Sequence, residues 1–353
     1  MNPDRKNLRL EARLAKGAPL KREEAANLWD LDLLTLGLAA DDRRCRLHPQ
    51  PRVTYVIDRN INYTNICISG CRFCAFFRPV GSPDGYVLDW DTLAAKLTEL
   101  KRHGGSGVLL QGGLNPELSL NYYEELLHFI RGFGLAVHGF SPPELNFIAE
   151  QNGITLKNLL ERFMEAGLSS IPGGGAEILV DRVRRQISPL KGSSARWLEV
   201  MVLAHELGLP TSATMMFGHL ETREERLEHL FKIRELQEAT GGFRAFIPWT
   251  YQPGGTALGG ETAGAVEYLR TLAVCRLVLH NVPHLQVSWV TQGPKVAQVA
   301  LKFGADDFGS TMLEENVVAA TGVGFRLQRG EIESLIRQAG YEPQVRDHRY
   351  RLC

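Results

Sequence analysis

The sequence predicts an α/β fold, and a closed (β/α)8 barrel of the TIM type fits it best. Short β-like runs alternate with amphipathic helices through most of the chain. Eight such units in about 270 residues have the dimension of a barrel of parallel strands joined by right-handed crossovers. The 35 glycines fall mostly where a β-like run meets a helix. An open doubly wound sheet is the alternative, because the pattern of elements does not show whether the sheet closes.

The expected elements follow one another in a regular order. Residues 1–50 form an N-terminal helical extension with helices at 4–14 and 21–40, and residues 51–353 form the barrel with a C-terminal helical tail. Strands are expected at residues 53–57, 107–110, 136–139, 169–172, 211–217, 244–248, 286–290 and 306–308. Helices are expected at residues 91–102, 122–133, 155–166, 177–185, 194–207, 222–238, 263–280 and 295–303, and Asp89 is placed to cap the first of these.

The composition is that of a soluble globular enzyme, with 44% hydrophobic and 23% charged residues. Forty basic and forty acidic residues give a net charge of zero, so no overall field draws the chain toward nucleic acid or an anionic membrane. Residues 1–16 lack the apolar core of a signal peptide. No run approaches the ~18 apolar residues of a membrane span. We therefore expect a cytoplasmic protein that binds neither nucleic acid nor membrane.

Three cysteines, Cys67, Cys71 and Cys74, lie within eight residues in the spacing C-x3-C-x2-C. Three thiolates on one loop leave a four-iron cube or a tetrahedral ion one ligand short, and the open position is where a small molecule binds. A disulfide framework is disfavoured because the chain is long and its cysteines are few. A structural zinc site would show a second ligand pair, which the sequence lacks. A zinc- or iron-binding regulatory module without catalysis is the alternative to an enzyme.

The cysteine loop, with Phe73 before the third cysteine, resembles the C-x3-C-x-aromatic-C signature of the radical S-adenosylmethionine (SAM) superfamily. The resemblance implies a [4Fe-4S] cluster held by the three cysteines, with SAM on the open iron and Phe73 near its adenine. Residues 111–113 resemble the Gly-Gly-Glu element that receives the methionine amino group, although this chain reads Gln-Gly-Gly. Residues 214–221 resemble the G-x-I-x-G-x-x-E element beside adenine, with Thr214 in place of its first glycine.

These likenesses, together with two acids that follow strands, define the expected cofactor-binding residues. They are Phe73, Gln111, Gly112, Gly113, Glu144, Glu177, Met216, Phe217 and Gly218. Glu144 and Glu177 are placed to bond ribose hydroxyls. For Glu177 the equally good reading is an acid that stabilises a helix N-terminus.

Longer stretches at residues 62–65, 74–78, 171–179, 246–253, 288–295 and 305–316 resemble one subgroup of the superfamily. This subgroup contains the menaquinone enzymes of the futalosine pathway and the deazaflavin (FO) synthases. Within it, the chain looks most like the branch that cyclises dehypoxanthine futalosine. The resemblance implies that a 5′-deoxyadenosyl radical abstracts the C4′ hydrogen of the substrate ribose, and that flavodoxin or ferredoxin supplies electrons. Aminofutalosine synthase and FO synthase chemistry are the alternatives within the subgroup.

The reaction implied by this resemblance needs a general base near the substrate ring. Residues after strands are the candidates for the base or for polar contacts, namely His138, Glu144, Glu177, His219 and Tyr251. The expected substrate contacts are Arg78, Trp249 and Trp289. The plainer readings are a hydrogen-bonded structural role for the histidines, a solvated loop for Arg78, and core packing for the tryptophans.

Overall fold

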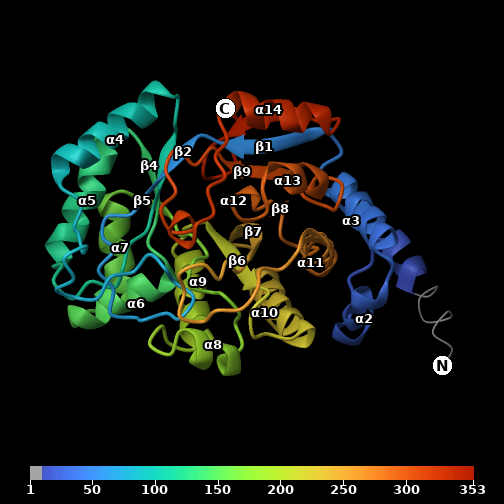
Figure 1. Cartoon of the computed structure of the whole chain (residues 1–353), viewed down its shortest axis with the longest axis horizontal. Helices are drawn as coiled ribbons and strands as arrows, with labels where there is room; N and C mark the ends of the chain where they lie inside the picture. Colours follow the sequence, from blue (N-terminus) through green and yellow to red (C-terminus); the bar gives the residue numbers. More distant parts are fainter. Residues whose placement is uncertain (1–9) are drawn as a thin grey trace.

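The computed structural model describes residues 10–353, and the N-terminal extension within it is helical. The first expected helix lies partly outside the described residues, and residues 10–15 of it are helical. The extension continues with α2 (Arg22–Ala26), the short 3-10 helix η1 (Asn27–Asp30) and α3 (Leu33–Leu47). The Asp32 carboxylate accepts hydrogen bonds from two backbone N–H groups at the start of α3, which caps that helix. Helix α3 packs against α11 (Ala265–Val278) on the outside of the molecule (Figure 1).

The strands form a barrel in which all paired neighbours are parallel. They are β1 (Arg52–Val56), β2 (Asp58–Ile61), β3 (Gly107–Leu110), β4 (Ala136–Gly139), β5 (Leu168–Ser170), β6 (Thr211–Phe217), β7 (Phe243–Thr250), β8 (His284–Leu285) and β9 (Asp307–Ser310). Strands β1 and β2 are one chain segment interrupted at Ile57, and they hold different neighbours: β1 pairs with β9 and β2 pairs with β3.

Isolated bridges close the barrel between its three sheets. The sheets run β10-β1-β9, β2-β3-β4-β5 and β6-β7-β8. Ile171 bridges to Thr211, which joins the β5 segment to β6, and Gln286 bridges to Asp307, which joins the β8 segment to β9. With β1 and β2 counted as one, the described residues therefore form a ring of parallel strands. The expectation of a closed barrel is confirmed, and the open sheet is excluded.

Helices surround the strands as the alternating pattern predicts (Figure 1). They are α4 (Trp90–Arg102), α5 (Leu120–Gly132), α6 (Pro142–Gln151), α7 (Leu156–Ala166), α8 (Asp181–Ile187), α9 (Ser194–Glu206), α10 (Arg223–Thr240), α11, α12 (Trp289–Gln292) and α13 (Pro294–Ala300). Three details differ from expectation. Helix α6 was not expected, and α8 begins four residues beyond Glu177. Strand β8 covers only His284–Leu285 and lies before the expected 286–290, where Gln286 forms a single bridge and α12 begins at Trp289.

The C-terminal segment is a helix followed by a strand, whereas the sequence predicted a purely helical tail. Helix α14 (Arg329–Gln338) lies beside β1, and β10 (Glu342–Arg346) then pairs with β1 in parallel (Figure 1). The residues after β10 turn into the barrel at the end where the strands begin. There the ring of Tyr350 stacks on His284, the first residue of β8, with ring centroids 4.1 Å apart. We call this end the floor, and the opposite end, where the cysteine loop lies, the mouth.

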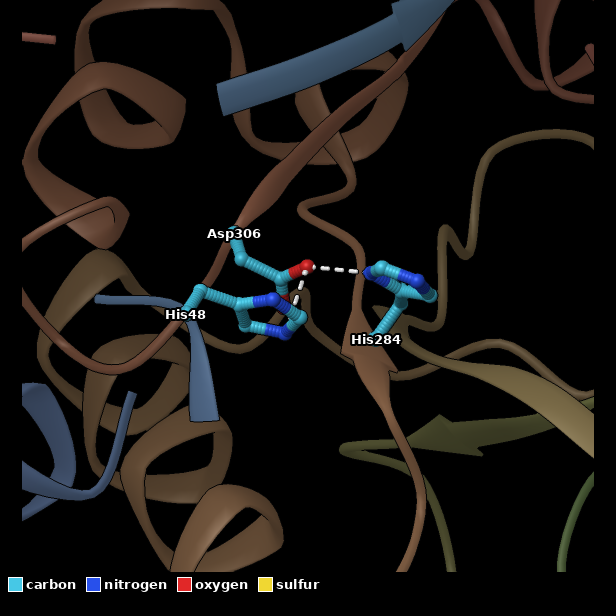
Figure 2. Close-up of side chains that lie close together, drawn as sticks. All are labelled: His48, His284 and Asp306. Atoms are coloured by element: carbon cyan, nitrogen blue, oxygen red, sulfur yellow. Dashed lines mark hydrogen bonds and ion pairs between the residues drawn. The ribbon is translucent and has the colours of Figure 1, made fainter. Parts of the chain in front are cut away.

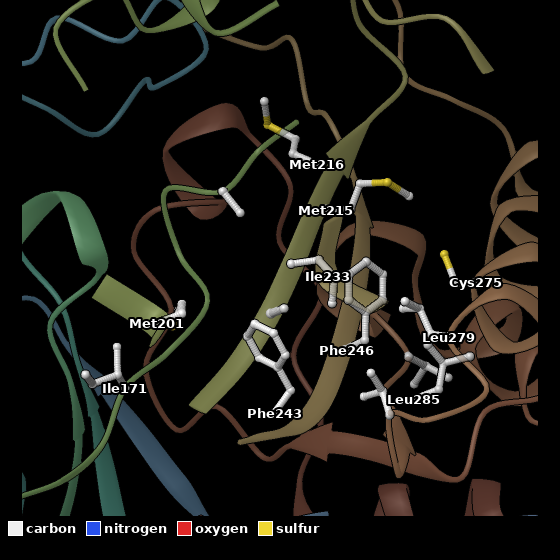
Figure 3. Close-up of a cluster of buried hydrophobic side chains, with 14 of the residues drawn as sticks. Ile171, Met201, Met215, Met216, Ile233, Phe243, Phe246, Cys275, Leu279 and Leu285 are labelled. Carbon is white, nitrogen blue, oxygen red and sulfur yellow. The ribbon is translucent and has the colours of Figure 1, made fainter. Parts of the chain in front are cut away.

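Apolar side chains fill the layer between the barrel and its helices. Met215 of β6 and Phe246 of β7 point away from the barrel axis toward α11, where they lie near Cys275 and Leu279 (Figure 3). All four side chains are almost completely buried. No helix among residues 10–353 has both the length and the apolar character needed to cross a bilayer.

A clamp of two histidines and one carboxylate fixes the outside of the floor (Figure 2). One oxygen of Asp306 lies 2.6 Å from Nδ1 of His284 and 3.3 Å from Nε2 of His48. The other oxygen accepts hydrogen bonds from the Arg276 guanidinium and from a backbone N–H. Burial opposes the charge of Asp306, but Arg276 and the histidines outweigh it and lower the pKa of this carboxyl. Because Arg276 already neutralises Asp306, the cluster serves to tie α3 to β8 and β9.

Candidate active site

A cavity of about 390 Å³ runs through the barrel from the cysteine loop at the mouth to the C-terminal tail at the floor. Most of the residues expected to bind cofactor or substrate line it. These are the three cysteines, Phe73, Gln111, Gly112, Gly113, His138, Glu144, Glu177, Trp249 and Trp289. In barrels of this kind the loops after the strands form the active face, and the cysteine loop follows β2 in that position.

The cysteine loop holds its thiols in a protected, reduced arrangement. Cys71 is buried, Cys67 and Cys74 are half-buried, and all three are free thiols. The hydroxyl of Ser69 lies 2.9 Å from Sγ of Cys67 and 3.4 Å from Sγ of Cys71, and the Leu114 N–H donates to Sγ of Cys67. Burial raises the pKa of Cys71 to about 11 and also raises that of Cys74. Thiols of this kind become thiolates when a metal replaces their protons.

The separation of the thiols suits a cluster better than a single ion. A tetrahedral zinc ion with Zn–S bonds of about 2.3 Å would bring its sulfur ligands within roughly 3.8 Å of one another. Among residues 10–353, only His48, His284 and Asp306 bring three possible ligand atoms of His, Cys, Asp or Glu within 4.8 Å of one another. The three cysteine sulfurs are therefore spread more widely than 4.8 Å. The donor set of three thiols around an open space is the one that a [4Fe-4S] cluster with one free iron requires.

Two glycines after β3 allow the cysteine loop to lie directly against the barrel. A Cβ atom on Gly113 would lie 2.1 Å from the carbonyl oxygen of Ile66 and 2.8 Å from Cβ of Cys67. A Cβ atom on Gly112 would lie 2.5 Å from the ring of Tyr63. Gly113 is therefore required by the close approach of the Ile66 backbone, and Gly112 by the packing of the Tyr63 ring against the turn.

Glu144 braces this Gly-Gly turn from the other side. Its Oε1 accepts hydrogen bonds from the Tyr63 hydroxyl at 2.8 Å and from the Gly112 N–H at 3.0 Å. Its Oε2 accepts from the N–H and hydroxyl of Ser141 at the start of α6. Burial raises the pKa of Glu144, and these four donors oppose that shift. Both carboxylate oxygens of Glu144 are thus occupied by hydrogen-bond donors from the protein itself. Glu144 therefore positions the loop and is poorly placed to act as a base.

A buried ion pair lies beside the cysteines, and only one of its members was expected. Nζ of Lys191 is 2.8 Å from Oε1 of Glu177 and lies 5.0 Å from the centre of the Phe73 ring. Burial opposes the lysine charge, but the neighbouring Cys71 thiol and Glu177 outweigh it and raise the pKa of Lys191. Burial likewise opposes the charge of Glu177. Lys191 stabilises that charge and outweighs the burial, so the pKa of Glu177 is lowered. Lys191 lies in a Pro-Leu-Lys-Gly loop where nothing in the spacing marks it as functional.

Glu177 does not cap a helix, because α8 begins four residues later. Its backbone has φ +42°, a left-handed conformation that is uncommon for residues other than glycine. Its carbonyl accepts the N–H of Met216, which fixes this loop to the end of β6. The local conformation thus directs the carboxylate toward Lys191 and the cavity rather than toward a helix N-terminus.

His138 is the expected base that points into the middle of the cavity. It lies on β4, and its Nδ1 lies 2.7 Å from the hydroxyl of Ser170 on β5. Burial lowers the pKa of His138 well below its usual range, so the ring is uncharged at neutral pH. With Nδ1 bonded to Ser170, Nε2 is the nitrogen available to a bound molecule.

The two tryptophans form apolar parts of the cavity wall. Trp249 of β7 is half-buried, and Trp289 at the start of α12 is buried with its Nε1–H donating to the carbonyl of Ser310 at 3.0 Å. Both side chains therefore combine packing with an apolar surface that faces the cavity.

Several expected residues lie outside the cavity lining. They are Arg78, Met216, Phe217, Gly218, His219 and Tyr251. One guanidinium nitrogen of Arg78 donates to three carbonyls of residues 75–77, which closes the cysteine loop on itself. His219 bonds the Met216 carbonyl and faces Glu221, and Tyr251 bonds Thr256 in the Gly-rich loop after β7.

Polar side chains at the floor end of the cavity were not identified from the sequence. Asp58 and Asn60 of β2, Arg346, His348 and Tyr350 all line it. Oδ1 of Asn60 and Nε2 of His348 are buried without a hydrogen-bond partner in the protein. The inward positions of a strand alternate, which points to Asp58 and Asn60, but no sequence pattern brings the C-terminal residues to the same place.

Comparison with known proteins places the chain in a family. Residues 61–233 match the radical SAM superfamily, and residues 240–353 match the CofH/MqnC C-terminal region. The cyclic dehypoxanthine futalosine synthase of Streptomyces coelicolor is 44% identical over 96% of this chain and 86% of its own length. The enzyme of the same name from Halalkalibacterium halodurans is 42% identical over 96% of this chain and 93% of its own.

A second group of relatives carries another name. The 5-amino-6-(D-ribitylamino)uracil–L-tyrosine 4-hydroxyphenyl transferase of Methanocaldococcus jannaschii is 39% identical over 85% of this chain and 87% of its own length. Among solved structures, the hydrogenase maturase HydG of Carboxydothermus hydrogenoformans superposes with a TM-score of 0.77 at 17% identity, covering 99% of this chain and 82% of its own. At that identity the likeness concerns the fold, which is the same barrel.

The cysteine loop at the mouth, the matched regions and the relatives agree with one another. Enzymes of this superfamily use a [4Fe-4S] cluster and SAM, and the three thiols, Phe73 and the Gly-Gly turn are placed around one end of a single cavity. The chain therefore belongs to the radical SAM superfamily, in the group that carries the CofH/MqnC C-terminal region.

Proposed function

We propose that this enzyme converts dehypoxanthine futalosine to cyclic dehypoxanthine futalosine, as a cyclic dehypoxanthinyl futalosine synthase of menaquinone biosynthesis. The observation that carries the proposal is the 44% and 42% identity to two synthases of that name over 96% of the chain. The cavity supports it, because one end gathers the cluster ligands while the middle offers aromatic walls and polar groups to a substrate with a ring and a sugar.

The chain's own residues hold the cofactors at the mouth. Cys67, Cys71 and Cys74 would ligate the cluster, and Phe73 would lie along the adenine of SAM. Buried Lys191 offsets part of the negative charge of the thiolates, and the pairing with Glu177 holds its ammonium beside them. When bound, the cluster and SAM supply the 5′-deoxyadenosyl radical that takes the C4′ hydrogen from the substrate ribose.

His138 is the best placed proton acceptor for the end of the reaction. After the sugar carbon has bonded to the benzoate ring, one ring C–H bond must break to restore aromaticity. The proton goes to Nε2 of His138, and the electron goes to a one-electron acceptor of the iron–sulfur or flavin class. His138 is suited to this role because it is uncharged and lies in the cavity wall.

The proposal is tested with protein reconstituted with iron and sulfide without oxygen, then reduced and mixed with SAM. Dehypoxanthine futalosine should yield 5′-deoxyadenosine and a product two hydrogens lighter than the substrate, both measured by mass spectrometry. Turnover only with an enolpyruvyl benzoate, the aminofutalosine-type substrate, would overturn the assignment.

The transferase activity is the second candidate because a relative with that name is 39% identical over 85% of the chain. It is tested in parallel with L-tyrosine and 5-amino-6-(D-ribitylamino)uracil. We expect no 5′-deoxyadenosine above the SAM-only background with this pair. Release of 5′-deoxyadenosine with this pair alone would assign the chain to the FO synthase side of the group.

We further propose a flavodoxin or ferredoxin as the electron donor and the cytoplasm as the location. A reducing compartment suits thiols that serve as metal ligands. The electron donor is tested by adding each purified, reduced donor protein to the reconstituted enzyme. Reduction of the cluster is followed by the loss of the cluster's absorbance near 400 nm, roughly the region of sulfur-to-iron charge transfer.

A further inference from the structure

The floor of the cavity is built by the C-terminal tail, and this places two rings against each other. The rings of His138 on β4 and His348 in the tail are stacked, with centroids 5.4 Å apart and planes at 27°. Both residues line the cavity. A stacked pair of imidazoles, one from β4 and one from the C-terminal tail, is therefore part of the cavity wall.

His348 is fixed in this position by its surroundings. Its Nε2 lies 3.5 Å from Oδ2 of Asp58 on β2, and the Ser310 hydroxyl bonds the other oxygen of Asp58. The ring also lies against Gly107 at the start of β3, where an added Cβ would come within 2.7 Å of Cδ2 of His348. The absence of a side chain at Gly107 therefore leaves the space that His348 occupies.

The tail itself is anchored by charge and stacking. Arg346 pairs with Asp307 of β9 at 2.5 Å, and its guanidinium lies 3.8 Å from the centre of the Tyr350 ring. Tyr350 stacks in turn on His284 of the floor clamp. In the sequence, His348 lies between Arg346 and Tyr350. Its place against His138 is therefore set by contacts with β2, β3 and β9 and, through Tyr350, with His284.

We propose that the C-terminal tail is part of the active site: the ring of His348, packed against Gly107 and lying beside Asp58, covers His138 and shields it from water so that it accepts the substrate proton. In this arrangement His348 is a positioning residue, and His138 is the group that meets the substrate. The inference deepens the proposed function and rests on it for the identity of the substrate.

The charges around His138 are consistent with this role. Burial has the largest effect on the pKa of His138, and His348 and Arg346 lower it further. Burial also lowers the pKa of His348, while Asp58 opposes that shift. Asp58 has its own pKa raised by burial, and Asp307 is committed to Arg346. The tail therefore shields His138 from water and places no free anion beside it that would favour the imidazolium.

The test measures the titration of His138 directly, in the full-length reconstituted protein with labelled histidine and without substrate. The NMR signal of His138 is assigned by its loss in His138→Gln. In the wild type it should show no titration between pH 8 and pH 5. In His348→Ala water reaches the ring, and we expect His138 to titrate near the unperturbed value of about 6.5.

The variant His348→Phe restores the covering ring without its nitrogens and should again suppress the titration. His128→Ala, which changes an exposed histidine on α5, is the matched control and should leave the His138 signal unchanged. An untitrated His138 in His348→Ala would overturn the proposal, and so would a His348→Phe variant that titrates like His348→Ala.

The second readout is the amount of cyclised product formed per 5′-deoxyadenosine. In the wild type this ratio should be the same at pH 8 and pH 6. In His348→Ala it should fall about fourfold at pH 6, the loss of uncharged imidazole for a group with a pKa near 6.5. A pH-independent ratio in His348→Ala would contradict the inference. If dehypoxanthine futalosine is not a substrate at all, the proposed function fails while the titration still decides the role of the tail.

Discussion

The mouth and the floor of the barrel are assembled in different ways. At the mouth, the three proposed metal ligands come from one loop of eight residues, and glycines allow that loop to lie against β3. At the floor, Asp58 of β2, His138 of β4 and His348 of the tail meet only because the barrel closes and the last strand returns to β1. Cluster ligation is thus a local property of the chain, whereas the proposed proton-accepting site is a property of the whole fold.

The largest loss of activity is expected at the mouth. Replacing Cys71 by Ala removes one of three cluster ligands, so iron content should fall well below about four per chain and turnover should reach background. The melting temperature of the protein without iron should change little, because the barrel has its own core. Iron analysis, visible absorbance and a thermal melt measure this.

The control for this prediction is Cys45→Ser, which changes an exposed thiol on α3 and should keep both iron and turnover. Full iron content in Cys71→Ala would mean that the cluster ligands have been assigned incorrectly.

The next largest effect on turnover is expected from Gly113→Ala. The new methyl group would lie 2.1 Å from the Ile66 carbonyl oxygen, so the cysteine loop must move away from β3. We expect a loss of stability of about 1–3 kcal/mol from overpacking. Turnover should fall about 100-fold, the scale expected when reacting groups are displaced by about 1 Å.

Gly132→Ala is the matched control for Gly113, because an added Cβ there meets no atom within 4 Å. It should fold and turn over like the wild type. Equal behaviour of the two variants in urea unfolding and turnover would show that the cysteine loop does not depend on close packing against β3.

The contrast between the two ends also explains what could be predicted from the sequence. The bounds of β3, β4 and β6 agree with expectation because each is a short run between turn residues. The cysteines were found because their chemistry depends on spacing. Lys191 was missed because it reaches the thiols through a loop whose conformation depends on tertiary contacts.

Two elements were missed for different reasons. Helix α6 carries a visible signal, since Ser141 caps it, prolines occupy its first turn and Glu144 completes a capping box, but Glu144 was considered only as an acid that follows a strand. Strand β10 carries no such signal, because its sequence, Glu-Pro-Gln-Val-Arg, is polar and its place is set by the free edge of β1. His348 could not be connected with His138 before the partner of β10 was known.

A third prediction concerns the buried pair beside the cysteines. Lys191→Met leaves Glu177 buried without its partner, which should cost about 3–5 kcal/mol at neutral pH. The double variant Lys191→Met with Glu177→Gln should recover most of this loss. Because the pKa of Glu177 is lowered in the folded protein, the contribution of the pair is present above the unfolded value of about 4.3 and is lost as the pH falls through the folded value.

Urea unfolding of the single and double variants at pH 7 measures this coupling. Lys157→Met is the control, since Lys157 forms an exposed pair with Glu161 at 3.9 Å and its loss should cost no more than about 0.5 kcal/mol. Additive losses in the double variant would show that Lys191 and Glu177 do not stabilise each other.

The smallest effect is expected at the floor, where the Tyr350 stack on His284 adds to the Arg346–Asp307 pair in anchoring the tail. Tyr350→Leu removes the stack on His284 and the contact with the Arg346 guanidinium, which together should cost about 1–2 kcal/mol. Tyr350→Phe keeps both ring contacts and loses only the hydroxyl that accepts a bond from Arg346, so it should cost less. Urea unfolding ranks the two variants.

Limited proteolysis tests whether this small loss is local. In Tyr350→Leu the tail should be cut sooner than in the wild type while the barrel stays intact, because the tail ends in exposed residues and loses one of the contacts that hold it against the barrel. Cys353→Ser, at the exposed C-terminus, should be cut at the wild-type rate. A tail as resistant in Tyr350→Leu as in the wild type would mean that the Arg346–Asp307 pair alone fixes the floor, and His348 would then keep its place under His138 without the stack.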